Sequence, residues 1–166
     1  MGRQKKRIIM ATILVVEDEL DVQKVVAKRL SSHGFTVHCA SDGYQAIEMA
    51  HKVNPDLIVL DLQLPAGDGL IVLRKIRMSA KIQRAHVVVL TGMTHEGYKK
   101  NVLKEGVDAY LQKPYDAQAL IDTIDKILKG TKDDTPCLVG SEKTSPEEEE
   151  FPLFAFAGKN QEDSST

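Results

Sequence analysis

The sequence predicts an α/β protein in which helices cover both faces of a doubly wound parallel sheet. Short apolar, β-branched runs alternate with segments of helical period five times between residues 12 and 129. Such alternation favours right-handed crossovers between parallel strands. In addition, acidic, hydroxyl and ammonium side chains stand at or just after the ends of four of these runs. In an open parallel sheet, that edge is where ligands bind.

Five runs are predicted to be strands because they are short, rich in β-branched residues and bounded by turn-forming residues. The third run is apolar throughout, as expected of a strand that is buried on both faces. The predicted strands are Thr12–Val16, Thr36–Ala40, Leu57–Leu60, His86–Leu90 and Ala109–Gln112. The segment Pro65–Gly69 is predicted to be a loop.

Five segments with a period near 3.6 residues are predicted to be helices. They run from Leu20 to Leu30, from the N-cap Asp42 to Val53, from Leu70 to Arg77, from Glu96 to Glu105 and from Ala117 to Lys129. The first helix repeats at helical spacing through Leu20, Val22, Val25, Val26, Arg29 and Leu30. The second ends at Asn54-Pro55, because the residue before a proline avoids helical backbone angles.

Composition describes a water-soluble folded protein. The chain is 42% apolar and 28% charged, which is typical of globular domains. No apolar run approaches the roughly 18 residues of a membrane span, and the basic start lacks the apolar region of a secretory signal. The two cysteines form no metal or redox motif, and Cys39 is predicted to be a core thiol. We therefore expect a cytoplasmic protein without a membrane span.

The net charge is distributed unevenly along the chain. Residues 1–12 carry +4, residues 13–129 balance at zero, and residues 130–166 carry −6. A nucleic-acid binder needs a broad basic surface. The neutral middle therefore argues against direct nucleic-acid binding.

The chain divides into three predicted parts: a basic N-terminal arm at 1–11, a folded domain at 12–129, and an acidic tail at 130–166 that is mostly disordered. The polar part of the tail ends in the acidic run Glu147–Glu150. Segment 151–158 differs, because it contains three of the four phenylalanines of the chain. Exposed aromatic clusters often mark docking segments.

Five polar residues stand at the ends of predicted strands: Glu17, Asp18, Asp61, Thr91 and Lys113. If these strands are parallel neighbours, three carboxylates, a hydroxyl and an ammonium group meet in one crevice. Mg²⁺ prefers carboxylates together with water and phosphate oxygens, and a lysine can bind a phosphoryl group as a point charge. The pattern therefore predicts a site for a divalent cation and a phosphoryl group.

Asp61 is the pivotal residue, because a carboxylate can act as a nucleophile and form an acyl phosphate. Asp56 provides an internal comparison, since it stands at the opposite end of the same predicted strand. Each residue also has a structural alternative: a cap or dipole-compensating charge for the acids, a backbone partner for Thr91, and a surface cation for Lys113. The joint arrangement favours the functional interpretation.

Four motifs in this order resemble the response-regulator receiver domain of two-component signalling, a CheY-like domain. They are Ile13-Leu14-Val15-Val16-Glu17-Asp18-Glu19, Asp61-Leu62-Gln63-Leu64-Pro65 with Asp68-Gly69, Val89-Leu90-Thr91, and Ala109-Tyr110-Leu111-Gln112-Lys113-Pro114. The resemblance covers roughly residues 12–129. It implies a flavodoxin-like sheet of five strands in the order 2-1-3-4-5.

The resemblance also implies a role for each site residue. Asp61 would be the phosphoacceptor, attacking a phosphohistidine on a sensor histidine kinase or a histidine phosphotransfer protein. The Mg²⁺ ligands would be Glu17, Asp18, Asp61 and the backbone carbonyl of Gln63. Thr91 and Lys113 would bind the phosphoryl group.

Further expectations concern the switch and the departures from the family pattern. Tyr110 would be the switch aromatic, turning inward when Thr91 moves, and Lys113-Pro114 would be a cis peptide. Glu17 stands where an aspartate is commoner, Tyr115 where a phenylalanine is usual, and Gly92 where another small residue is common. Gln63 and Met93 occupy positions that tune dephosphorylation in this family. None of these departures removes a catalytic group.

The expected function is a phosphorylation-controlled protein-interaction switch acting on a downstream protein target. Its changing surface would comprise the helix at 96–105, the fifth strand and the last helix. Such a protein is not a dedicated enzyme, because it catalyses only its own phosphorylation and dephosphorylation. The alternative is a receiver fragment of, or an intermediate in, a larger phosphorelay or transcriptional regulator. The acidic tail shows no paired helical pattern, which disfavours a helix-turn-helix output within this chain.

Dedicated enzymes on the same fold are disfavoured by particular residues. A flavodoxin would need a Ser/Thr/Gly phosphate loop where this chain has Glu17-Asp18-Glu19. A dehalogenase-type aspartyl phosphatase would need a second acid where this chain has Gln63.

Overall fold

The computed structural model describes residues 10–65, 67–93, 95–130 and 137–139. Its main sheet has six parallel strands in the order β2-β1-β3-β6-β7-β8. The strands are β1 (Thr12–Val16), β2 (Thr36–Ala40), β3 (Leu57–Asp61), β6 (His86–Thr91), β7 (Ala109–Gln112) and β8 (Cys137–Val139). The first five of these in sheet order are the five predicted strands, so the predicted order 2-1-3-4-5 is confirmed.

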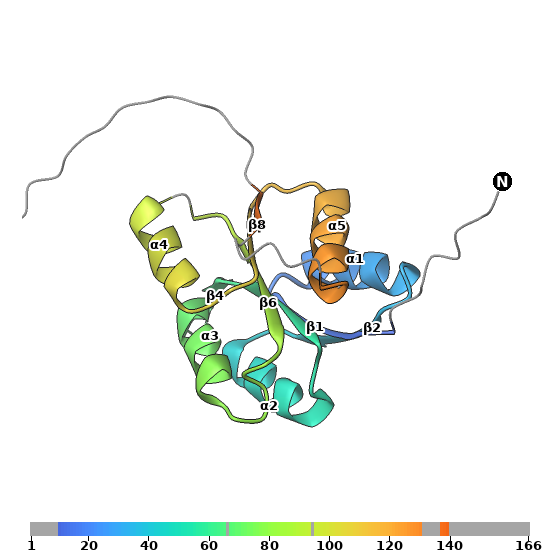
Figure 1. Ribbon diagram of the computed structural model, residues 1–166, viewed down its shortest axis with the longest axis horizontal. Helices are drawn as coiled ribbons and strands as arrows, with labels where there is room; N and C mark the ends of the chain where they lie inside the picture. The colour runs from blue at the N-terminus through green and yellow to red at the C-terminus, as the bar shows by residue number, and fades with distance from the viewer. Residues whose placement is uncertain (1–9, 66, 94, 131–136, 140–166) are drawn as a thin grey trace, which may run out of the picture.

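Helices cover both faces of this sheet, as predicted (Figure 1). Helices α1 (Leu20–Ser32) and α5 (Ala117–Leu128) pack on one face. Helices α2 (Gly43–Val53), α3 (Gly69–Met78) and α4 (Glu96–Lys104) pack on the other. Within the described residues, no helix is long and apolar enough to cross a membrane.

Strand alternation divides the core into two layers. On β1, Ile13 and Val15 face the α1–α5 layer, whereas Leu14 and Val16 face the layer of α2, α3 and α4. Neighbouring strands continue the same period of two, because successive side chains of a strand point to opposite faces. The central strands are therefore apolar on both sides, and their polar residues are confined to the strand ends.

The short connection after β3 departs from the predicted loop. It forms a two-stranded antiparallel hairpin of β4 (Gln63–Leu64) and β5 (Gly67–Asp68). A Cβ on Gly69 would lie 2.5 Å from the Leu62 Cα atom. The close approach of the two backbones at this point therefore requires glycine. This packing returns the chain towards the end of β3 before α3 begins.

Several boundaries and exposures also differ from the sequence-based expectation. Strands β3 and β6 each run one residue further and include Asp61 and Thr91 as their last residues. Of the helical repeat in α1, Val26 and Leu30 are buried, but Leu20 is 55% exposed and Val25 is 61% exposed. The helix therefore presents apolar side chains outside the core as well as within it.

Strand β8 is a feature that the sequence analysis did not predict. It pairs in parallel with β7, with Val139 opposite Leu111. It therefore covers the edge that β7 would otherwise leave open, and its carboxyl end lies at the same edge of the sheet as that of β7. Most of the predicted N-terminal arm and the aromatic segment 151–158 lie outside the described residues.

Candidate metal and phosphoryl site

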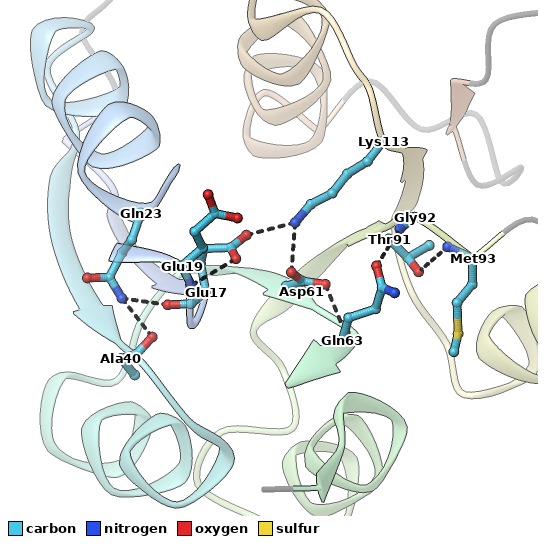
Figure 2. Close-up of polar contacts among 10 residues, drawn as sticks. All are labelled: Glu17, Glu19, Gln23, Ala40, Asp61, Gln63, Thr91, Gly92, Met93 and Lys113. Atoms are coloured by element: carbon cyan, nitrogen blue, oxygen red, sulfur yellow. Dashed lines mark hydrogen bonds and ion pairs between the residues drawn. The ribbon is translucent and has the colours of Figure 1, made fainter. Parts of the chain in front are cut away.

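The predicted site lies at the carboxyl edge of the sheet, and Figure 2 shows Glu17, Asp61, Thr91 and Lys113 there. Glu17 and Asp18 follow β1, Asp61 ends β3, Thr91 ends β6, and Lys113 follows β7. The three acids each offer a carboxylate oxygen, and these oxygens all lie within 4.8 Å of one another. The arrangement follows from topology, because parallel neighbours bring their carboxyl ends to one edge.

Asp61 is held by two hydrogen bonds that use different oxygens. Its Oδ1 atom accepts from the backbone N–H of Gln63 at 2.8 Å, and its Oδ2 atom accepts from the Lys113 ammonium group at 2.7 Å. The residue is only 2% exposed. Both oxygens of this carboxylate are therefore held in fixed positions.

Glu17 is equally buried, at 2% exposure, and its backbone is anchored by a residue that the sequence analysis missed. The Gln23 side-chain amide donates to the backbone carbonyls of Glu17 at 2.8 Å and of Ala40 at 3.0 Å (Figure 2). Gln23 thus ties the ends of β1 and β2 to helix α1. The available signal was a polar residue on the apolar side of a helix, between Val22 and Val26.

Lys113 bridges the two buried acids. Its Nζ atom lies 2.9 Å from Glu17 Oε2 and 2.7 Å from Asp61 Oδ2. Burial favours the neutral amine, but the hydrogen bonds and charges of Asp61 and Glu17 outweigh it, so the pKa of Lys113 is raised. The lysine side chain is therefore positively charged and faces the Oδ2 atom of Asp61.

The pKa of Glu17 is also raised. Burial is the largest cause, and the negative charge of Asp61 adds to it, while the hydrogen bond from Lys113 acts in the opposite direction. Two facing carboxylates with a single ammonium group leave an excess of negative charge. A further cation at this position would relieve that excess.

Thr91 lies beside this group and is fully buried. Its Oγ1 atom accepts from the backbone N–H of Met93 at 3.0 Å, and its backbone carbonyl accepts from Lys113 N–H at 2.8 Å. The hydroxyl keeps its proton for a further acceptor. Close by, the Gln63 side chain accepts from the Gly92 N–H at 3.1 Å and connects the ends of β3 and β6.

Tyr110 is buried at 3% exposure and packs in the layer of α2, α3 and α4. Its hydroxyl donates to the Met93 carbonyl at 3.1 Å, and the Lys99 ammonium group lies 5.7 Å from the ring centroid. Thr91 and Tyr110 thus contact the same residue, one through its N–H and the other through its carbonyl. The Lys113–Pro114 bond is cis, as the family resemblance implies.

The donor set fits Mg²⁺. Three carboxylate oxygens within 4.8 Å of one another are hard ligands of the kind this ion prefers. Asp18 is the most solvent-accessible of the three acids, so the crevice is open to water on its side. Mg²⁺ characteristically keeps several water ligands.

Comparisons with known proteins identify the family of this chain. Residues 13–125 match the family model described as the response regulator receiver domain. The chain is 35% identical over 122 residues to the response regulator MprA of Mycobacterium leprae, covering 74% of this chain and 53% of that protein. It is 32% identical over 119 residues to a probable transcriptional regulator, ycf27, of Guillardia theta, covering 72% of this chain and 46% of that protein. The chain spans about half the length of these curated relatives.

Solved structures show the same fold. The chemotaxis response regulator CheY4 of Vibrio cholerae superposes with a TM-score of 0.67 at 27% identity, covering 72% of this chain and 99% of that one. The receiver domain of the sensor histidine kinase PA1611 of Pseudomonas aeruginosa PAO1 gives a TM-score of 0.67 at 31% identity, covering 74% and 100%. That domain holds a magnesium ion in its active-site cleft. This chain belongs to the response regulator receiver domain family.

Proposed function

We propose that Asp61 accepts a phosphoryl group from a phosphohistidine of a partner protein in a Mg²⁺-dependent reaction, and that phosphorylation switches a protein-interaction surface. The observation that carries the proposal is the buried Asp61 carboxylate, held by Lys113 within 4.8 Å of the oxygens of Glu17 and Asp18. The partner would be a sensor histidine kinase or a histidine phosphotransfer protein.

In this reaction an Asp61 oxygen attacks the phosphorus atom, the P–N bond to the donor imidazole breaks, and the imidazole leaves with the bonding electron pair and takes up a proton. The product is an acyl phosphate. Mg²⁺ would be held by Glu17, Asp18, Asp61 and the Gln63 carbonyl. When bound there, it would supply positive charge to the phosphoryl oxygens.

Side chains of the protein itself would supply the other contacts to the phosphoryl group. Lys113 already donates to Asp61 and can transfer that hydrogen bond to a phosphoryl oxygen as charge develops there. Thr91 can donate its hydroxyl proton to another phosphoryl oxygen. A movement of Thr91 would reach Tyr110 through Met93, because both side chains hydrogen-bond to that residue.

On this proposal the chain is not a dedicated enzyme, acts in the cytoplasm, and catalyses only its own phosphorylation and dephosphorylation. The length of the chain relative to its curated relatives supports a second candidate function. Since the chain spans about half of its curated relatives, it could instead function as a receiver fragment of, or an intermediate in, a larger phosphorelay or transcriptional regulator.

The first test uses beryllofluoride, a phosphoryl mimic, with Mg²⁺ and amide NMR. We expect shifts at Thr91, Met93 and Tyr110 that need both components and vanish in Asp61→Asn. An Asp56→Asn variant serves as the matched control, because Asp56 lies at the opposite end of β3. Equal shifts in Asp61→Asn would overturn the assignment of the acceptor.

A Mg²⁺ titration without the mimic tests the metal site separately. Asp18→Asn should weaken Mg²⁺ binding by about tenfold, since one charged ligand is lost. Unchanged affinity in Asp18→Asn would remove Asp18 from the ligand set without affecting the role of Asp61.

A further inference from the structure

An apolar groove runs between α1 and α5, on the face of the sheet opposite Tyr110. It has a volume of about 690 Å³. Its apolar lining includes Val22, Val25, Val26, Tyr115, Leu120 and Ile121. Although this surface is continuous with the core, Val25 is 61% exposed. Exposed apolar surface of this kind marks a place where another apolar segment binds.

The chain carries a second apolar segment, which lies outside the described residues. Phe151, Phe154 and Phe156 are three of its four phenylalanines, and Leu153 lies among them. Pro152 favours an extended backbone for the residue before it. Such a segment can place several large apolar side chains along a groove.

Strand β8 brings the tail to the correct edge of the sheet. Val139 is paired with Leu111, and Pro114, three residues after Leu111, lines the groove. Strand spacing and chain geometry therefore put the groove within about 16 Å of Val139. Residues 140–150 can span roughly 36 Å when extended. The tether is thus long enough for Phe151 to reach any part of the groove.

Charge sets the direction in which the segment would lie. The end of the groove near the phosphoryl site is lined by Glu19, Asp21 and Lys113, and the ammonium group of Lys113 is already paired with two acids of the site. The far end is lined by Arg29. Arg29 is exposed, and none of the described residues forms an ion pair with its side chain. The acidic run Glu147–Glu150 directly precedes Phe151. It would be repelled at the first end and attracted at the second.

We propose that the tail of this chain binds its own receiver domain, with Phe151–Phe156 in the α1–α5 groove and Glu147–Glu150 beside Arg29. Because the segment is tethered, its binding to the groove is intramolecular. A short flexible linker gives an effective concentration in the millimolar range, so the groove can be occupied even when the intrinsic affinity is low. The segment would then lie beside Lys113 and Tyr115, which line the same groove.

The small number of phenylalanines allows a direct test in the full chain. Labelling with 4-fluorophenylalanine gives four ¹⁹F signals, of which Phe35 is buried at 7% exposure and reports folding. We expect the three tail signals to be displaced from their positions in urea, independently of protein concentration. Tail signals at their urea positions would contradict the proposal, and displacement that grows with concentration would assign the groove to a second copy.

Two pairs of variants locate the contact. Val25→Asp should lower the docked population by about tenfold, whereas Ile71→Asp should leave it unchanged, because Ile71 is similarly exposed at 50% but lies on α3. Arg29→Glu should weaken docking in a salt-dependent manner, with Arg84→Glu as its control. Equal effects within either pair would overturn the proposed position.

A reciprocal variant protects the test against misfolding. Replacing Phe151, Phe154 and Phe156 by serine changes none of the described residues, and it should shift the methyl signals of Val25 and Ile121 in the full chain. Unmoved methyl signals would contradict the proposal even if the groove variants proved unstable.

Discussion

At the amino edge of the sheet, Asp56 and Asp108 accept hydrogen bonds from backbone N–H groups, whereas at the carboxyl edge Glu17 and Asp61 share one ammonium group. Asp56 accepts from the Thr12 N–H at 2.7 Å. Asp108 accepts from the Val87 N–H at 2.8 Å and pairs with His86 at 2.7 Å.

Each acid of the amino edge therefore accepts a hydrogen bond from the backbone of a strand that it borders. Those of the carboxyl edge are brought together, with Lys113 as their shared partner. The same residue type thus fastens strands at one edge and forms a cation and phosphoryl site at the other. What distinguishes the two edges is whether the acids face backbone donors or face one another.

The strongest way to break this comparison is to exchange one acid at each end of β3. Asp61→Asn should reduce phosphoryl incorporation from acetyl phosphate by roughly 10³-fold or more, because the nucleophile is removed. Asp56→Asn should retain incorporation and lose only stability. Radiolabelled phosphoryl transfer measures the first effect and urea denaturation the second. Comparable labelling of the two variants would mean that the edges are not functionally distinct.

Lys113→Ala tests the carboxyl edge by removing the shared partner. Without Mg²⁺, the free energy of unfolding should fall by about 2–3 kcal/mol, because two facing buried carboxylates lose their cation. Added Mg²⁺ should restore more stability to this variant than to the wild type. Since the pKa of Lys113 is raised, its contribution is present below its ordinary value near 10.5 and is lost as the pH rises through the raised value. An unfolding curve unaffected by the substitution would contradict this.

Asp108→Ala tests the amino edge in the same way. Loss of the acceptor of the Val87 N–H should cost about 1–2 kcal/mol of stability. Arg77 would also lose a carboxylate 3.7 Å away. Phosphoryl incorporation and Mg²⁺ affinity should be unchanged, and a change in either would show that the two edges are coupled.

The smallest expected effect is that of Tyr110→Phe, which removes only the hydrogen bond to Met93. We expect a loss of about 0.5–1.5 kcal/mol at neutral pH. Burial, followed by the charge of Glu96, raises the pKa of Tyr110. The unfolded tyrosine therefore ionises first as the pH rises above 10, the wild type loses stability, and the difference from Tyr110→Phe narrows. Denaturation at pH 7 and above pH 10 measures the trend, and a widening difference would contradict it.

Much of the fold could be predicted because its elements carry strong local signals. The apolar run at Leu57–Leu60 lies where the structure has β3, and the predicted helix end at Asn54 lies where the structure ends α2. Asn54 ends its helix in the left-handed region. The convergence of Glu17, Asp61 and Lys113 could be predicted for the same reason, since each of them ends or directly follows a predicted strand.

What local pattern could not reveal depends on contacts between distant segments. Gln23 is recognised as an anchor only once β2 places the Ala40 carbonyl beside that of Glu17. Val25 repeats at the spacing of a buried residue, yet it is exposed, because α5 leaves a groove instead of covering it. Strand β8 is only three residues long, and helix α5 separates it along the chain from its partner, β7.

The sequence by itself determined the alternation of strands and helices, and thereby which polar residues close each strand, because period and strand-end chemistry are local properties. Only the tertiary structure decided which acids share a cation and which accept from backbone, because those partners come from strands that are neighbours in space and distant along the chain.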